Sequence, residues 1–158
     1  MSHPFYRFAS VAAVLLVAMG LTLAATQVSG QTNPLVNVDA NGVGLHGYDP
    51  VACFTDGKAV KGDPQYHSRY DGATYYFRSS DDKAAFDKEP QYAPQYGGYW
   101  AMAMGKLEDG DPNYFLVYDG KLFLQRNEKA HMMFSQDPEG NRKKADENWS
   151  KLRSQQGD

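Results

Sequence analysis

The sequence has a single cysteine, no block of basic residues and only one uncharged run of membrane-spanning length. A lone thiol cannot close an intrachain disulfide, so the hydrophobic core alone has to hold the fold together. The chain carries 16 Lys and Arg against 19 Asp and Glu, which gives a net charge of −3. A mildly acidic chain without a basic patch argues against nucleic acid as a partner.

The uncharged run lies at the N-terminus and is typical of a secretory signal peptide. His3 and Arg7 precede the uncharged residues 8–25, and small residues with plausible cleavage positions follow. We therefore expect residues 1–30 to be a signal peptide and the rest of the chain to lie in the periplasm or to be secreted, without a membrane span. The alternative is a retained anchor, because the run is just long enough to cross a bilayer.

The length of 158 residues allows one domain of ordinary size. We expect an extended lead-in at residues 31–43, a domain over residues 44–153 and a short tail at residues 154–158. We expect no internal repeat, and the sequence contains no low-complexity tract.

Two Asp-Gly pairs between aromatic runs predict two β-hairpins. The first hairpin joins residues 65–70 to residues 73–78, and its simplest register pairs Tyr66 with Phe77. Because side chains alternate along a strand, both rings then face the core, whereas His67 lies on the more polar face. The second hairpin joins residues 114–118 to residues 121–125 and is expected to be covered on both faces.

Three helices are predicted from capping signals. Ser79 caps a helix that ends before Pro90, Asn127 caps a short helix through Ser135, and Pro138 opens the last, amphipathic helix. Hairpins interleaved with short helices indicate a single small domain of the α+β class. The expected core contains Tyr66, Tyr75, Phe77, Phe86, Phe115, Leu122 and Trp149.

A series of motifs occurs in order along this domain. It comprises residues 47–52 (GYDPVA), residues 66–68 (YHS), residues 75–77 (YYF), residues 92–98 (YAPQYGG), residues 119–122 (DGKL) and residues 145–149 (ADENW). The series resembles the YHS family, named for the tripeptide at Tyr66. The resemblance implies a small α+β module that is sometimes attached to metal-transporting ATPases and monooxygenases. It implies no settled biochemical role for the exported, stand-alone members.

Several side chains of the types that bind soft metals occur in the domain. They are Cys53, His46, His67, His131, Met102 and Met104. Thiolate, imidazole and thioether groups together suit Cu(I), so a site for copper or another soft metal is one prediction. The alternative is that Met102, Met104 and Met133 fill gaps in an aromatic core, that Cys53 is a small buried hydrophobe and that His67 is a hydrogen-bonded strand residue.

We therefore expect an exported, non-catalytic accessory or binding protein, with copper or another soft metal as its candidate ligand. The alternative is a structural or protein-interaction module that binds no metal. A small enzyme is a third hypothesis, since Cys53 with His67 or His46 could form a thiolate–imidazole pair. No sequence signature of such an enzyme accompanies these residues.

Overall fold

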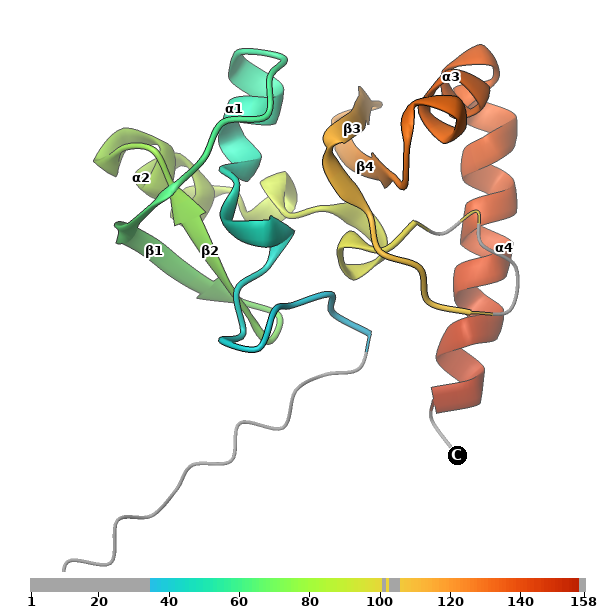
Figure 1. Ribbon diagram of the computed structural model, residues 1–158, viewed down its shortest axis with the longest axis horizontal. Coiled ribbons are helices and arrows are strands. Elements are labelled where there is room, and N and C mark those ends of the chain that lie inside the picture. The colour runs from blue at the N-terminus through green and yellow to red at the C-terminus, as the bar shows by residue number, and fades with distance from the viewer. Residues whose placement is uncertain (1–34, 101, 103–105, 157–158) are drawn as a thin grey trace, which may run out of the picture. The chain divides into compact units, whose positions relative to one another are not determined.

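The computed structural model describes residues 35–100, 102 and 106–156. This part of the chain is an α+β domain with two antiparallel two-stranded sheets and four α-helices (Figure 1). The strands are β1 (Asp63–Tyr70), β2 (Ala73–Phe77), β3 (Asp111–Tyr118) and β4 (Lys121–Gln125). The α-helices are α1 (Pro50–Thr55), α2 (Ser80–Lys88), α3 (Glu128–Gln136) and α4 (Pro138–Gln156), and the 3-10 helices are η1 (Leu45–Gly47), η2 (Pro90–Tyr92) and η3 (Gln95–Gly98).

The expected signal peptide, residues 1–30, lies outside the described residues. Among the helices that the structure describes, none combines the length and the apolar character needed to span a bilayer.

Both predicted hairpins are present, and each turns at its Asp-Gly pair. The φ angles are 47° and 86° at Asp71 and Gly72, and 51° and 66° at Asp119 and Gly120. Positive φ at both central residues is the geometry of the tight turn whose twist matches that of the flanking strands.

The predicted register of the first hairpin is right near the turn and wrong at the open end. His67 pairs with Tyr76 as expected and is exposed. Beyond that pair the strand bulges, and Phe77 pairs with Asp63 instead of Tyr66. A bulge leaves extra residues of one strand unpaired, which simple alternation cannot anticipate.

The three predicted helices begin at the predicted caps. Ser79 accepts a hydrogen bond from the backbone N–H of Asp82 at 3.1 Å, and Asn127 accepts one from Ala130 at 2.9 Å. Pro138 is the first residue of the last helix, which continues through Gln156, three residues past the predicted boundary of the domain.

Helix α1 was not predicted from the sequence. Asp49 caps it by accepting hydrogen bonds from the backbone N–H groups of Val51 and Ala52, at 2.8 and 3.3 Å. Pro50 occupies the first helical position, where its missing N–H costs nothing. Asp-Pro alone does not decide the element in this chain, because Asp63-Pro64 and Asp111-Pro112 begin the strands β1 and β3.

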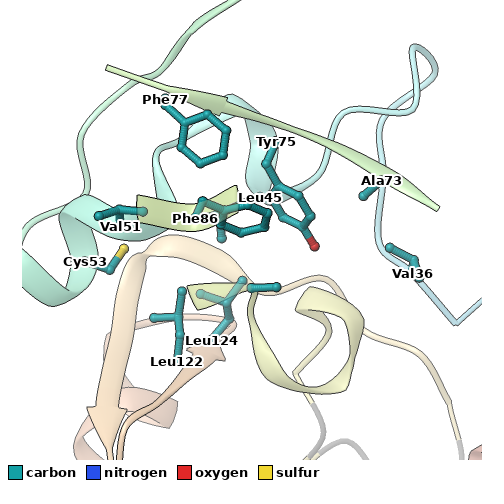
Figure 2. Close-up of a cluster of buried hydrophobic side chains, with 11 residues drawn as sticks. Val36, Leu45, Val51, Cys53, Ala73, Tyr75, Phe77, Phe86, Leu122 and Leu124 are labelled. Atoms are coloured by element: carbon teal, nitrogen blue, oxygen red, sulfur yellow. The ribbon is translucent and has the colours of Figure 1, made fainter. Parts of the chain in front are cut away.

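The hydrophobic core lies where α1 meets both hairpins (Figure 2). Val51 and Cys53 of α1 lie between the aromatic side chains of the first hairpin and α2 and the leucines of β4. Of the predicted core residues, Tyr75, Phe77, Phe86 and Leu122 are buried, and Tyr66 and Phe115 are partly buried against them.

Trp149 was predicted for this core and lies elsewhere. Its ring is half-buried and lies 5.8 Å from the ring of Tyr96. Phe123, on the face of β4 opposite to the leucines, extends this second aromatic group through Tyr96. The second hairpin is thus covered on both faces, as predicted.

The two hairpins belong to two copies of one structural unit. In the second hairpin every ladder partner is numbered 48 higher than its counterpart in the first: Asp63↔Phe77 corresponds to Asp111↔Gln125, and His67↔Tyr76 to Phe115↔Leu124. The bulge recurs at the same place in both ladders. The conclusion from the sequence that no internal repeat exists is therefore wrong.

Identical residues follow the same spacing. They are Gly62-Asp63-Pro64 and Gly110-Asp111-Pro112, Tyr66 and Tyr114, Tyr70-Asp71-Gly72 and Tyr118-Asp119-Gly120, Arg78 and Arg126, Phe86 and Phe134, and Pro90 and Pro138. The helix caps Ser79 and Asn127 also correspond. The identities are too sparse to stand out by eye, since most apolar positions differ between the copies.

The correspondence extends upstream of the hairpins at a spacing of 51. Residues 45–47 have φ angles of 51°, 50° and 73°, and residues 96–98 have 55°, 61° and 86°. The next backbone contacts match as well, because Asp49 N–H donates to Val60 O and Trp100 N–H donates to Glu108 O, both at 2.8 Å. We call residues 43–90 the first half and residues 94–138 the second half.

Candidate functional site

The soft-metal candidates lie in different surroundings. Cys53 is buried in the core, and its Sγ lies 3.7 Å from the carbonyl oxygen of Asp49 as a hydrogen-bond donor. Burial, with a smaller contribution from the charge of Asp49, raises the pKa of the Cys53 thiol to about 12. Burial therefore disfavours the thiolate, which is the form that acts as a nucleophile or binds a metal.

The two histidines of the first half lie in separate surface hollows. His46 Nε2 is 2.9 Å from Oδ1 of Asp109. His67 lies on the exposed face of β1, and its Nδ1 is 2.9 Å from the carbonyl oxygen of Pro64. Their neighbours are therefore a carboxylate in one case and a backbone carbonyl in the other.

The remaining candidates belong to the second half. His131 lies on α3, and its buried Nδ1 has no hydrogen-bond partner within the described part of the chain. Met102 lines a groove beside α3, whereas Met104 falls outside the described residues. Over residues 35–100, 102 and 106–156, no three His, Cys, Asp or Glu side chains are grouped so as to hold a metal ion. A copper site stays a prediction.

A buried carboxylate joins the elements of the first half, and sequence reasoning did not select it. Asp49 is fully buried, and besides capping α1 it accepts a hydrogen bond from the backbone N–H of Arg78 at 2.9 Å. Burial raises the pKa of the Asp49 carboxyl from its usual 3.8 to about 6, and the nearby Asp82 carboxyl adds to the effect. The backbone hydrogen bonds oppose this shift because they favour the charged form.

Arg78 connects this carboxylate to its neighbours. Its Nε donates to Asp82 at 2.6 Å, and its Nη1 pairs with Asp56. The guanidinium thereby links the end of β2 to α2 and to the end of α1. These contacts give a structural role to Asp49, Asp56, Arg78 and Asp82.

An open groove of about 260 Å³ runs along α3. It is lined by Trp100, Met102, Arg126, Asn127, Lys129, Ala130, Met133, Phe134 and Asn141. Two of the large hydrophobic side chains that are exposed in the described structure, Met132 and Met133, lie on this helix with 54% and 57% of their surface accessible. Only Met133 of the two borders the groove, and its exposure shows that the expectation of Met133 as a gap-filler in the core is wrong.

The rim of the groove is cationic. The guanidinium of Arg126 lies 4.5 Å from the centre of the Trp100 ring, and its Nη1 is 2.9 Å from Glu108 Oε2. Lys129 is exposed and takes part in none of the ion pairs found between described residues. The groove thus combines apolar walls with an unneutralised cation on a chain of net negative charge.

Comparison of the chain with protein-family models, with curated proteins and with solved structures finds no match. The resemblance to the YHS family therefore stays a prediction that rests on the motifs themselves. The sequence analysis did not select the groove, because Lys129 and Met133 look like ordinary residues of a short helix. Alignment of the two halves is the signal that could have found it, since these residues replace Asp81 and Ala85.

Proposed function

We propose that this chain is an exported, non-catalytic binding module of the YHS type, and that it holds a segment of a partner protein in the groove along α3. The observation that supports this proposal is the open apolar groove with Met133 exposed at its edge. Among the hypotheses from the sequence, this is the protein-interaction module.

The side chains at the groove suit recognition of a protein. Methionine is unbranched and polarizable, so it adapts to different partner surfaces and is common where proteins bind peptides. Trp and Arg are enriched at the centre of protein interfaces, and Trp100 and Arg126 are stacked on each other here. Surface methionines carry a hydration cost that a bound partner would remove.

The reactive groups of the domain support a non-catalytic role. In this proposal the Cys53 thiol fills the core and Asp49 caps a helix, so both are committed to structure. Metal is left out because Cys53 lies in the core, whereas His46 and His67 lie in two separate surface hollows.

In-cell photocrosslinking tests the proposal. A photoreactive phenylalanine analogue replaces Met133 in the full chain, and the same analogue replaces the exposed Arg69 on β1 as a control. We expect a discrete protein adduct from position 133 and none from position 69. Equal adducts from both positions, or none from position 133, would contradict the proposal.

Export is tested separately by the intact mass of the native protein. We expect the mature chain to begin between Thr26 and Gln31 and to be recovered with the soluble periplasmic or secreted fraction. Recovery of the chain with residues 1–25 attached would contradict export by cleavage.

A further inference from the structure

Several residues that line the groove are counterparts of residues around α1 in the first half. Helices α2 and α3 are counterparts, and α1 packs against α2 and β2 (Figure 1). Trp100 in the wall of the groove is the counterpart of Asp49, which begins α1. Phe134, also in the wall, is the counterpart of Phe86, which lies in the core beside Val51.

Part of the framework around the two places is the same. In the first half the rings of Tyr75 and Phe86 lie 5.2 Å apart at an interplanar angle of 39°. In the second half Phe123 and Phe134 lie 5.5 Å apart at 33°. Because α1 packs on β2 and α2 in the first half, the matching surface of β4 and α3 in the second half can accommodate a helix.

The segments that lead into the two hairpins differ in length. Tyr48 and Gly62 are 14 positions apart, whereas their counterparts Tyr99 and Gly110 are 11 positions apart. The second half thus has three residues fewer at the point where the first half builds its six-residue helix.

The charges around the two places differ in sign. Arg78 is neutralised by the carboxylates of Asp82 and Asp56. Its counterpart Arg126 pairs with Glu108, and the position that matches Asp82 is Ala130. Lys129 replaces Asp81 in the same helical turn. Where the first half has the carboxylates of Asp81 and Asp82, the second half has the ammonium group of Lys129 and the methyl group of Ala130.

We propose that the groove binds a short helical segment of the partner protein, apolar on the side that enters the groove and carrying a carboxylate that reaches Lys129 or Arg126. In this proposal the segment packs against α3 as α1 packs against α2. The inference rests on the proposed function and names the class of partner for the same groove. An amphipathic helix in an apolar groove is a common mode of peptide recognition.

A fluorescent peptide provides the test. It carries the α1 sequence with serine in place of cysteine, Asp-Pro-Val-Ala-Ser-Phe, followed by an alanine-rich helical extension. Binding to the mature full-length chain is measured by fluorescence anisotropy. We expect saturable binding, and no binding of a matched peptide in which a central proline prevents the helix.

Matched variants of the protein locate the bound peptide. We expect Met133→Glu to weaken binding on the order of tenfold, as loss of an interface anchor does, and Met132→Glu to change it less than about twofold. Lys129→Glu should weaken binding of the Asp-containing peptide by up to about fivefold. A peptide with Lys in place of this Asp should bind Lys129→Glu more tightly than it binds the wild type. Circular dichroism melts verify that the variants remain folded.

Equal binding of the helical and the proline-containing peptide would overturn the inference, and so would equal losses from Met132→Glu and Met133→Glu. A crosslinked protein at position 133 without binding of the helical peptide would overturn the helical partner and leave the proposed function standing. Absence of both the adduct and peptide binding would overturn both.

Discussion

Asp49 is a carboxylate that caps a helix while having no surface in contact with solvent. Burial disfavours its charged form, so its pKa in the folded protein is about 6 against 3.8 in a typical solvated carboxyl. Between these values the native state binds the proton more tightly than the unfolded chain does. The contribution of this group to stability is therefore fully present below about pH 4 and is lost as the pH rises through about 6.

We predict that the pH dependence of stability between about pH 4 and pH 6 contains a component due to Asp49. Asp49→Asn should lower the free energy of unfolding at about pH 4, because an amide nitrogen in place of Oδ2 cannot accept the hydrogen bond from the Arg78 N–H. The difference between wild type and variant should shrink as the pH rises through this range. Urea unfolding at a series of pH values measures it, and a difference that is constant with pH would contradict the prediction. The pKa values of Asp56 and Glu108 are lowered by their basic partners. Their contributions to the pH dependence are the same in the wild type and the variant, so they do not affect the difference.

Cys53 gives a second prediction for a single residue. The thiol is buried, and its pKa is raised to about 12, so both access and thiolate formation limit its reaction. We expect alkylation by iodoacetamide at neutral pH to be at least about a hundredfold slower in the folded protein than in denaturant. Mass spectrometry of timed samples measures the two rates. A comparable rate in both states would show an accessible thiol and would support Cys53 as a candidate metal ligand.

The helix caps are the features of single elements that the sequence predicts best. Ser79 and Asn127 were identified from residue type and position alone, and each accepts the expected backbone hydrogen bond. We predict that Ser79→Ala and Asn127→Ala each lower the free energy of unfolding by about 1 kcal/mol. Ser135→Ala, at an exposed position late in α3, serves as the control and should be neutral within about 0.5 kcal/mol. Denaturant midpoints without a loss for either cap would contradict this.

What the sequence could not predict at this scale depends on contacts between elements. The Asp-Gly turns depend only on local conformation, so both hairpins were found. The pairing of Phe77 with Asp63 depends on a bulge, and the place of Trp149 depends on how α4 lies against the second half. The groove requires knowing which surface α1 covers. Asp49 and Pro50 do not by themselves predict helix α1, because the same pair begins the strands β1 and β3.

At the scale of the whole molecule, comparison of the two halves shows which sequence differences between them the structure requires. Position 46 is a histidine at φ 50°, and its counterpart Gly97 has φ 61°. The backbone conformation alone therefore does not require glycine. A Cβ on Gly97 would lie 2.0 Å from the carbonyl oxygen of Leu35, and the Gly97 carbonyl accepts a hydrogen bond from Asn37 N–H at 2.8 Å. The close approach of this chain segment requires the glycine.

We predict that Gly97→Ala is more destabilising than Gly42→Ala. Gly42 has φ 77°, and a Cβ there would meet nothing within 4 Å, so its cost is the strain of the left-handed conformation, about 1 kcal/mol. Gly97→Ala adds a clash with backbone and should cost at least about 2 kcal/mol. Thermal melts of the two variants give the comparison, and equal midpoints would show that the segment at Leu35 moves aside freely.

The core that α1 builds between Phe77 on one side and Leu122 on the other belongs to neither half alone (Figure 2). A chain severed between Pro90 and Pro94 would leave one fragment holding α1 and the other holding the leucines that cover it. Each fragment would expose an apolar face to water until it met its complement. We therefore expect each unit to need the other for stability, so that during synthesis the first becomes stable only after the second has left the ribosome.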